Sequence, residues 1–254
     1  MFAQERQEKI LKMLKNRGSV KVSELSKKLG VSPVTIRKDL ESLEAKGVLV
    51  RIHGGAMLPN HSKAEWDFMK KLHQKEKEKK EIAKKAVEYI EDGDTIILDS
   101  SSTTYYIALE LRKSPIRILT IVTNNIFIAE KLIGTSFEIL VLGGIIRENS
   151  LSLVGSWTSK LIQEINVDKA FLGTTGFKKE KGFMVPNIIE AEVKAEMVKA
   201  SSKVFIVTDS SKFSRAAFST FALPEDVDYL ITDQNIPKDC EEFLEENNVI
   251  VEKV

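Results

Sequence analysis

Short, continuous apolar runs alternate with helical stretches from residue 81 onward, and this alternation limits the possible folds of the chain more than any other feature. Strands are predicted at residues 95–98, 118–122, 137–142, 169–172, 204–207 and 228–232, with a candidate edge strand at 249–251. Helices are expected near residues 103–112, 125–133, 157–165, 189–201 and 239–247. Strands that are apolar throughout are buried on both faces, so the pattern predicts an α/β domain with a mostly parallel sheet between helices.

The first 58 residues follow another pattern, in which short helices are separated by glycine-containing turns. A helix is expected over residues 3–16, where apolar residues recur at helical spacing. Ser23 is expected to cap a second helix that ends before Gly30, and Ser32 is expected to cap a third. Two short helices joined by a turn with glycine are typical of a helix-turn-helix, which favours DNA binding.

The third helix carries the side chains that are expected to read bases. Ile36, Leu40 and Leu43 recur at positions i, i+4 and i+7 and form its buried face. Val34 and Lys38 therefore point away from the core, and the first turns of a recognition helix enter the major groove. Val34 suits a thymine methyl group, and Lys38 suits the hydrogen-bond acceptors of guanine.

Phosphate contacts are expected around these two residues. Thr35 and Arg37 flank them, and the positive N-terminus of the helix favours an anion. The apolar stretch at residues 48–56 ends in two glycines and predicts a β wing, on which Arg51 and His53 share one face. The expected DNA-contacting residues are Ser32, Pro33, Val34, Thr35, Arg37, Lys38, Arg51 and His53.

The charge of the chain is divided between its two parts, although the whole has a formal net charge of only +1. Residues 1–58 hold 12 Lys or Arg and 6 Asp or Glu, whereas the remainder holds 26 basic and 31 acidic residues. Such an asymmetry favours a polyanionic partner for the basic part. Among the acidic residues of this part, Asp39 points sideways from the third helix, and we expect it to pair within the domain rather than face DNA. The alternative is a three-helix domain that contacts another protein and has an ordinary solvated basic face.

Residues 59–80 are expected to form a linker and a solvated helix, because lysine and glutamate dominate their second half. No apolar run approaches the roughly 18 residues needed to span a bilayer. The single cysteine, Cys240, excludes a disulfide framework and a cysteine-based zinc site. We therefore expect a cytoplasmic protein with no membrane partner, no metal and no cofactor, divided into residues 1–58, 59–80 and 81–254.

Small, hydroxylated or charged residues follow five of the predicted strands. Ligands of parallel α/β sheets bind beyond the carboxyl ends of the strands, so these residues are expected to form one binding site. Turn chemistry alone explains any one of the five clusters, but it explains all five together poorly. The expected site residues are Asp99, Ser100, Ser101, Ser102, Thr103, Thr104, Thr123, Asn124, Asn125, Gly143, Gly144, Arg147, Gly173, Lys194, Asp209, Lys212 and Arg215.

The chemistry of this set suits a phosphorylated sugar or polyol. The hydroxyl-rich run at residues 100–104 leads into a helix, whose backbone N–H groups can bind a phosphate. Lys212 and Arg215 can balance its charge, and Asp99 and Asp209 can accept hydrogen bonds from sugar hydroxyl groups.

The segment from Val22 to Leu40, with its core Thr35-Ile-Arg-Lys-Asp-Leu40, and the later run from Arg51 to Ala56 resemble the DNA-binding motif of the DeoR-type bacterial sugar-metabolism repressors. The resemblance implies a winged helix-turn-helix followed by an effector and oligomerisation domain similar in fold to ribose-5-phosphate isomerase. It extends over nearly the whole chain. The matching positions are residues 99–104, 123–125, 142–144, 152–155, 173–176, 190, 191, 194 and 209–213.

Ser101 departs from the family pattern, which commonly has glycine there, so the geometry of the predicted phosphate loop is open. Lys194 stands at or near the position where the isomerases carry their catalytic glutamate. The resemblance therefore implies an oligomeric repressor that binds operator DNA and senses a phosphorylated sugar without catalysis. An active sugar-phosphate isomerase with Glu190 as its base, and a DNA-binding protein without any ligand, remain as alternatives.

Overall fold

The computed structural model describes residues 2–46, 48–52, 54–57, 68, 71–148 and 150–254. His53, Gly47 and residues 59–67, 69 and 70 of the expected linker lie outside this description. The chain divides into two compact units, Met1–Lys71 and Leu72–Val254, which we call the head and the body. Each has its own apolar core.

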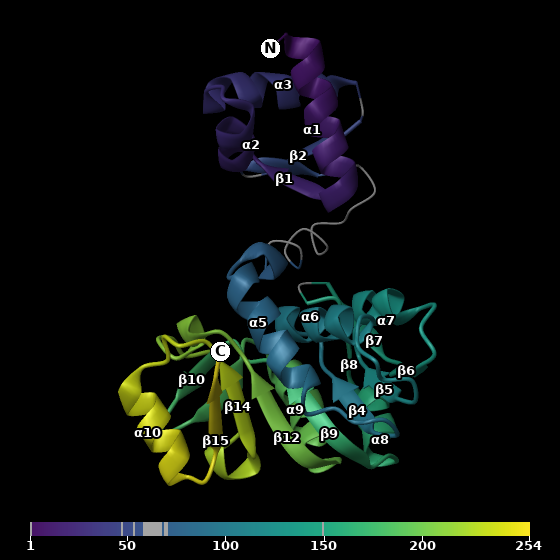
Figure 1. The fold of residues 1–254 in the computed structure, drawn as a ribbon, viewed down its shortest axis with the longest axis vertical. Coiled ribbons are helices and arrows are strands. Elements are labelled where there is room, and N and C mark those ends of the chain that lie inside the picture. Colours follow the sequence, from purple (N-terminus) through teal and green to yellow (C-terminus); the bar gives the residue numbers. More distant parts are fainter. Residues whose placement is uncertain (1, 47, 53, 58–67, 69–70, 149) are drawn as a thin grey trace. The chain divides into compact units, whose positions relative to one another are not determined.

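Up to Met57, the described part of the head consists of three helices and a small antiparallel sheet (Figure 1). The helices are α1 (Ala3–Arg17), α2 (Val22–Leu29) and α3 (Pro33–Ala45), and the strands are β1 (Ser19–Lys21), β2 (Val50–Ile52) and β3 (Gly55–Met57). The strand order is β1-β3-β2, so β2 and β3 form the predicted wing and β1 extends it. The winged helix-turn-helix is confirmed.

The two predicted N-caps have different outcomes. The Ser32 side chain accepts a hydrogen bond from the Thr35 amide at 3.2 Å, and Pro33 occupies the first turn of α3, as expected. The prediction for Ser23 is wrong, because α2 starts at Val22 and its N-cap is Lys21, whose side chain makes no capping bond. The backbone of β1 runs directly into α2, and Val22 is buried in the head core, so packing decides where this helix begins.

The body is built around a seven-stranded sheet with the order β15-β14-β12-β9-β4-β5-β6. All neighbouring strands are parallel. The strands are β4 (Thr95–Leu98), β5 (Thr120–Thr123), β6 (Glu138–Val141), β9 (Val167–Leu172), β12 (Ser201–Val207), β14 (Tyr229–Thr232) and β15 (Ile250–Lys253). All seven predicted strands are present, including the candidate edge strand. The chain reverses its direction of travel across the sheet between β4 and β9, which makes their carboxyl ends the topological switch point.

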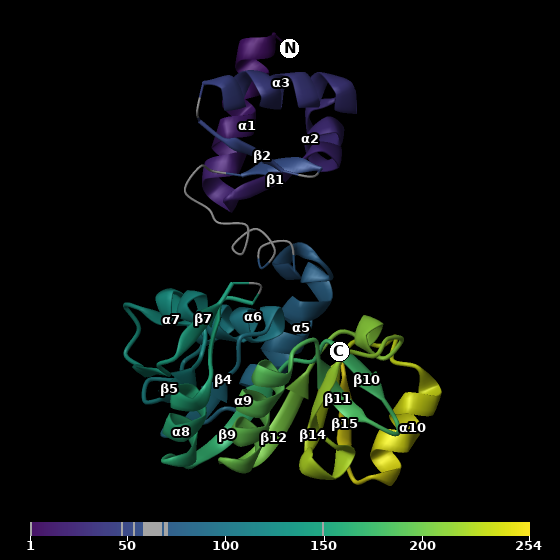
Figure 2. The ribbon, with the colours of Figure 1, turned by 180° about the vertical axis from the view of Figure 1, so that it is seen from behind.

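Helices cover both faces of this sheet, as predicted, and Figures 1 and 2 show them from opposite sides. The helices are α5 (Glu76–Val87), α6 (Ser102–Leu111), α7 (Ile126–Leu132), α8 (Ser156–Gln163), α9 (Ile188–Lys199) and α10 (Lys238–Glu246), with short 3-10 turns at η1 (Ser210–Lys212) and η2 (Pro224–Asp226). Helix α5 packs on β12 and β14, and α9 packs on β9 and β12 from the other face.

Two small sheets were not predicted from the sequence. One is the hairpin of β7 (Ile145–Arg147) and β8 (Ser152–Val154), and the other has the order β10-β11-β13. Its strands are β10 (Gly176–Lys178), β11 (Gly182–Val185) and β13 (Ser219–Ala222). These strands have three or four residues and lie close to glycines or loops, so their apolar runs are too short to stand out.

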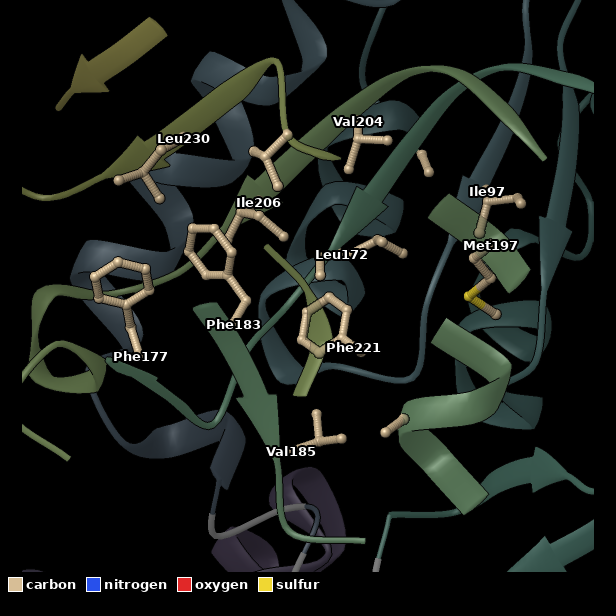
Figure 3. Packing of buried hydrophobic residues seen from close by; sticks show 14 of the residues in the cluster. Ile97, Leu172, Phe177, Phe183, Val185, Met197, Val204, Ile206, Phe221 and Leu230 are labelled. Carbon is tan, nitrogen blue, oxygen red and sulfur yellow. The ribbon is translucent and has the colours of Figure 1, made fainter. Parts of the chain in front are cut away.

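Successive residues of the central strands point to opposite faces of the sheet. On the α5 face, Phe171 and Phe205 stack with ring centroids 4.8 Å apart, and Phe205 stacks on Tyr229 at 4.5 Å. On the other face, Leu172 and Ile206 point into an apolar cluster with side chains of the small three-stranded sheet (Figure 3). Both faces are therefore dry, which explains why the strands are apolar throughout.

Candidate functional site

The exposed surface of α3 carries the predicted base-reading residues. Ile36, Leu40 and Leu43 are buried in the head core, and the opposite side presents Val34, whose side chain is 58% exposed, together with exposed Lys38. A valine this exposed gains nothing from the head core, so the structure leaves it available to a partner. Arg37 is exposed beside them.

The expected pairing of Asp39 within the head is confirmed. The Arg6 guanidinium of α1 donates hydrogen bonds to both carboxylate oxygens of Asp39, one of them at 2.9 Å from Nη2. Both side chains are buried, and the hydrogen bond to Asp39 raises the pKa of Arg6. This ion pair fastens α1 to α3 and removes the negative charge of Asp39 from the surface that carries Lys38.

Arg51 of the wing has two carboxylate partners on α3. Its Nε donates to Glu44 Oε2 at 2.8 Å, its backbone N–H donates to Glu44 Oε1 at 2.9 Å, and its Nη1 donates to Glu41 Oε1 at 2.6 Å. The backbone and guanidinium bonds from Arg51 lower the pKa of Glu44. Arg51 therefore connects the wing to α3, in addition to the DNA contact that the sequence predicts for it.

Asp99 organises the carboxyl ends of β4 and β9. Its Oδ1 accepts hydrogen bonds from the Ser101 amide at 2.9 Å and the Thr104 hydroxyl at 3.0 Å. Its Oδ2 accepts from the Gly173 amide at 2.8 Å and from Lys194 Nζ. Because Asp99 is fully buried and all of these donors belong to the chain, it holds the loop in place rather than presenting an open carboxylate.

Lys194 reaches the same point from α9. Its ammonium group pairs with Asp99, donates to the Gly173 carbonyl at 2.7 Å, and lies 4.9 Å from the centroid of the Phe221 ring. Burial of this lysine is tolerable because the Asp99 carboxylate balances its charge. Four predicted site residues, Asp99, Ser101, Gly173 and Lys194, are thus brought together at the switch point.

Ser101 fits this loop without strain, although the sequence left its geometry open. Its φ is −79°, which any L-residue adopts, and its hydroxyl caps α6 by accepting from the Thr104 amide at 3.1 Å. The first-turn amides of Ser102 and Thr103 point out of the helix start, where no intrahelical carbonyl can reach them. Ser100 and Ser102 are half-buried, and Thr103 and Thr104 are buried.

The residues after β5 hold the β7–β8 hairpin. Asn125 caps α7 by accepting from the amides of Phe127 and Ile128, and its amide group donates to the Ser150 carbonyl at 3.3 Å. Asn124 donates to the Leu153 carbonyl at 3.1 Å. The Thr123 hydroxyl accepts from the Asn125 amide.

The glycines after β6 permit a close approach of α8. Gly144 has a φ of +147°, and a Cβ on it would lie 2.2 Å from the Thr158 hydroxyl. That hydroxyl donates to the Gly143 carbonyl at 2.7 Å. Packing therefore requires glycine at position 144, whichever ligand the site takes. A Cβ on Gly143 would meet only Leu161 Cδ1, at an ordinary contact distance of 3.8 Å.

Arg147 pairs with Glu190, a residue that the predicted site set does not include. The Arg147 Nε lies 3.0 Å from Glu190 Oε1, and Ser150 Oγ donates to the same oxygen. Ser150 and Ser152 share a hydrogen bond of 2.7 Å. Glu190 lies 43 residues after Arg147 in the sequence, so no local spacing pattern could have predicted this pair.

A second polar cluster follows β12 and β14. Asp209 accepts from the Ser211 amide at 3.2 Å and lies 3.4 Å from Lys212 Nζ. Asp233, which the predicted set also lacks, accepts from the Ser210 amide and hydroxyl at 2.7 and 2.8 Å. The rule that polar residues follow strands could have found Asp233, because it comes directly after β14.

The Arg215 side chain belongs neither to the cluster around Asp99 nor to the one around Asp209 and Asp233. Its side chain is exposed, and its carbonyl accepts a hydrogen bond from the Phe177 amide at 3.0 Å. A Cβ on Gly176 would lie 2.5 Å from that carbonyl, so the loop carrying Arg215 packs closely against the segment after β9.

Buried polar atoms without a hydrogen-bond partner among the described residues gather at this edge of the sheet. They include Asn124 Oδ1, Asp209 Oδ2 and Thr232 Oγ1, from segments at the ends of β5, β12 and β14. Nearly all buried polar atoms in native proteins are hydrogen-bonded, so such atoms indicate a place for a polar ligand. Within the described ranges, no group of three or more His, Cys, Asp or Glu is placed to hold a metal ion. No described helix is long and apolar enough to cross a membrane.

Comparison with known proteins identifies relatives of both units. Residues 6–62 match the family described as "DeoR-like helix-turn-helix domain", and residues 74–234 match the "DeoR C terminal sensor domain". The putative aga operon transcriptional repressor of Escherichia coli O157:H7 is 36% identical, covering 97% of this chain and 92% of that protein. The transcriptional regulator GlpR of Haloferax volcanii is 34% identical, covering 99% and 98%. The lactose phosphotransferase system repressor of Staphylococcus epidermidis is 34% identical, covering 91% and 92%.

Solved structures show more distant likenesses. Ribose 5-phosphate isomerase A from Methanocaldococcus jannaschii is 18% identical, with a TM-score of 0.40, and the match covers 55% of each chain. The eIF2B delta subunit from Chaetomium thermophilum is also 18% identical, with a TM-score of 0.47 and coverage of 62% of this chain and 56% of that one. At these values the likenesses carry no inference about activity.

Proposed function

The chain belongs to the DeoR family of transcriptional regulators, and from that premise we propose that a phosphorylated sugar or polyol, bound in the body, controls its affinity for operator DNA. In this proposal residues 1–58 read DNA, residues 59–80 connect the two functions, and residues 81–254 bind the effector and assemble the oligomer. The names of relatives support this direction, since one is a repressor of the aga operon and another a repressor of the lactose phosphotransferase system.

We propose that α3 enters the major groove. Val34 and Lys38 contact base edges there, and Thr35 and Arg37 contact the flanking phosphates. The observation that supports this is the 58% exposure of Val34 on the face opposite to the buried Ile36. Ser32 and Pro33 place the helix N-terminus at the phosphate backbone. Arg51 and His53 of the wing contact the DNA backbone or the minor groove.

We propose that the effector phosphate binds at the start of α6. The amides of Ser102 and Thr103 and the hydroxyls of Ser100, Ser102 and Thr103 donate to it. The Thr104 hydroxyl donates to Asp99 instead, and together these two residues hold the loop in position. Lys212 and Arg215 supply positive charge. Lys194 contributes through its pairing with Asp99, so it sets the position of the loop and of Gly173.

The observation that carries the sugar part of the proposal is a pair of buried acceptor atoms that receive no hydrogen bond. Asp209 Oδ2 and Asn124 Oδ1 flank the switch point and have no hydrogen-bond donor among the described residues, although Asp209 Oδ2 forms an ion pair with Lys212 at 3.4 Å. A carboxylate oxygen and an amide oxygen both accept hydrogen bonds from hydroxyl groups. A ligand with several hydroxyl groups satisfies them, whereas inorganic phosphate alone, ionised at neutral pH, donates poorly.

The proposal does not require catalysis. An aldose–ketose isomerase needs a carboxylate that is free to move a proton between adjacent carbons. Asp99 is held by four donors, and Glu190 is held by Arg147 and Ser150. Both carboxylates therefore hold parts of the site in position and are not free to transfer a proton. No observation favours the alternative that the chain is an active isomerase.

The experiment is a thermal-shift panel of sugar and polyol phosphates, with each unphosphorylated parent compound as its control. A ligand that raises the melting temperature is then titrated into a complex of the chain with operator DNA selected from a random duplex pool. A 100-fold change in DNA affinity requires a coupling free energy of about 2.7 kcal/mol. We expect Lys212→Met to weaken the thermal shift, and Lys203→Met, an exposed lysine at the other end of β12, to leave it unchanged. A DNA complex that no phosphorylated sugar or polyol weakens or strengthens contradicts the proposal.

A further inference from the structure

The body exposes an apolar surface at the β6 end of its central sheet. Six side chains form it, and we call them the β6 patch: Leu140, Val141, Ile145, Ile146, Trp157 and Leu161. Trp157 and Ile145 are 75% and 73% exposed, and the other four are 41–51% exposed. Monomeric proteins seldom expose large apolar residues in such a group, so the patch calls for a partner.

The members of the patch come from elements that are held together. Thr158 of α8 donates to the Gly143 carbonyl, just after β6, and a Cβ on Gly143 would lie 3.8 Å from Leu161 Cδ1. The hairpin places Ile145 opposite Val154, two residues before α8 begins. Figure 1 shows β6, β7 and α8 at the same end of the body, and Figure 2 shows β7 and α8 together at that end from behind.

The two edges of the central sheet differ in how they are protected. On β15, Lys253 pairs with Glu241 at 2.6 Å and Glu252 accepts from the Tyr89 hydroxyl at 2.6 Å, so charged side chains cover that edge. On β6, only the first residue, Glu138, is charged. The last three residues are apolar, and Leu140 and Val141 are exposed on opposite faces of the strand. Natural proteins protect free edge strands with charges or prolines, so an edge strand with three consecutive apolar residues indicates an interface.

We infer that the β6 patch is the surface through which a second copy of this chain binds. Its exposed side chains amount to on the order of 600 Å², close to the roughly 800 Å² that each partner contributes to a standard interface. A projecting tryptophan and an open cavity of about 350 Å³ lie in the same region. The cavity is lined by Ile145, Ile146, Val154, Gly155 and Ile189, together with the charged residues Arg147 and Glu148. An isologous contact uses one surface twice, so it needs both a projection and a hollow in that surface.

The choice of a second copy rests in part on the proposed function. One helix-turn-helix reads a short half-site, and two-fold dimers read two of them. DNA is not the occupant, because no lysine or arginine is among the six patch residues. Tryptophan is enriched at the energetic centres of protein interfaces, which assigns Trp157 the central place.

Sedimentation velocity of the full chain without DNA tests the inference. We expect the unmodified chain to sediment as a dimer or larger, and Ile146→Glu and Trp157→Glu each to raise the dimer dissociation constant at least about 100-fold, as expected for truncating a central interface residue. Ile250→Glu is the matched control, because Ile250 on the opposite edge is 50% exposed and Ile146 is 51% exposed. Trp157→Phe should retain most of the affinity.

The outcomes separate this inference from the proposed function. A monomeric wild-type chain, or charged variants that sediment like the wild type, overturns the inference, and the patch then serves another protein or none. Cooperative thermal unfolding of each variant checks its fold, and hydrogen exchange of the wild-type chain gives a measurement without substitution. Amides of residues 138–146 should exchange faster as the chain is diluted, and equal rates at all concentrations contradict the inference. Ligand-induced thermal shifts test the effector site independently, because no patch residue belongs to it.

Discussion

Gly173 lies so close to Ser101 that a Cβ added to the glycine would be 2.3 Å from the serine Cβ. The two residues share one space at the ends of β4 and β9, and only one of them can carry a side chain there. We predict that Gly173→Ala destabilises the body by about 2 kcal/mol, the usual cost of overpacking. Urea unfolding followed by circular dichroism measures this.

Ser101→Gly provides the control for that steric explanation. Introduced alone it loses a capping hydroxyl, at a cost of a few tenths of a kcal/mol. Combined with Gly173→Ala it should restore most of the lost stability, because the space becomes free. Additive losses in the double variant contradict the shared-space explanation.

The Asp99–Lys194 pair predicts a strong asymmetry between single and double variants. Lys194→Met leaves the Asp99 carboxylate buried without its counter-charge, and we expect a loss of about 3–5 kcal/mol in the free energy of unfolding. Asp99→Asn in the same background removes that charge and should recover part of the loss. A thermodynamic cycle from urea unfolding of the four proteins gives the coupling. Zero coupling would show that the two residues do not interact.

The recognition helix predicts different responses for base and phosphate contacts. Lys38→Ala should cost about 1–3 kcal/mol on the selected operator and relax the preference at one base pair. Arg37→Ala should weaken binding to all duplexes alike and reduce the slope of log affinity against log salt by about 1. Fluorescence anisotropy on operator and scrambled duplexes at several salt concentrations distinguishes the two. Equal losses on both duplexes for Lys38→Ala would remove it from the base contacts.

The central sheet could be predicted because its strands are buried on both faces and are therefore apolar throughout. The Ser32 cap and the Arg6 partner of Asp39 illustrate the difference between local and distant signals. Ser32 accepts a hydrogen bond from a residue three positions away, and the sequence Ser-Pro is a recognisable signal for such a helix cap. Asp39 was expected to pair, but its partner lies 33 residues away and the sequence could not name it.

The candidate site shows the same limit. Polar residues after strands identified Asp99 and Gly173 as neighbours, because parallel strands end at one edge. The sequence did not show that both carboxylate oxygens of Asp99 accept hydrogen bonds from other residues of the chain. The Arg147–Glu190 pair joins a hairpin to α9, and neither the hairpin nor the pair has a local pattern. Such contacts are fixed by tertiary packing alone.

The wing arginine gives a prediction about DNA affinity. Glu44→Gln weakens the hydrogen bonds that Glu44 accepts from Arg51 and removes a negative charge beside the proposed DNA-binding surface. We expect binding to scrambled duplexes to strengthen about three- to tenfold at low salt and to differ less at high salt, because the effect is electrostatic. Glu5→Gln on α1, which also removes one exposed negative charge, is the control and should have little effect. Unchanged affinity for Glu44→Gln would assign Arg51 to the wing structure alone.

The ionised carboxylate of Asp233 stabilises the body, and this contribution to the free energy of unfolding is lost at acid pH. Burial opposes its ionisation, but hydrogen bonds from Ser210 and Asn235 outweigh it and lower the pKa of Asp233 below its usual value. Its unfolded pKa is about 3.9, so the ionised form stabilises the fold fully above that pH. This stability is lost as the pH falls through the lower, folded pKa.

We therefore expect Asp233→Asn to lower the free energy of unfolding by about 2 kcal/mol at pH 6, the value of hydrogen bonds to a charged group. The difference from the wild-type chain should shrink as the pH falls below 4, because the carboxylate then becomes protonated in the unfolded state while the folded state still holds it ionised. The difference should be smallest below the folded pKa, where the wild-type carboxylate is protonated in both states. Urea unfolding at a series of pH values measures it. Glu225→Gln, at an exposed carboxylate near η2, should leave the pH profile unchanged. A difference that stays constant down to pH 3 would mean that the charge of Asp233 contributes nothing and that only the shape of its side chain matters.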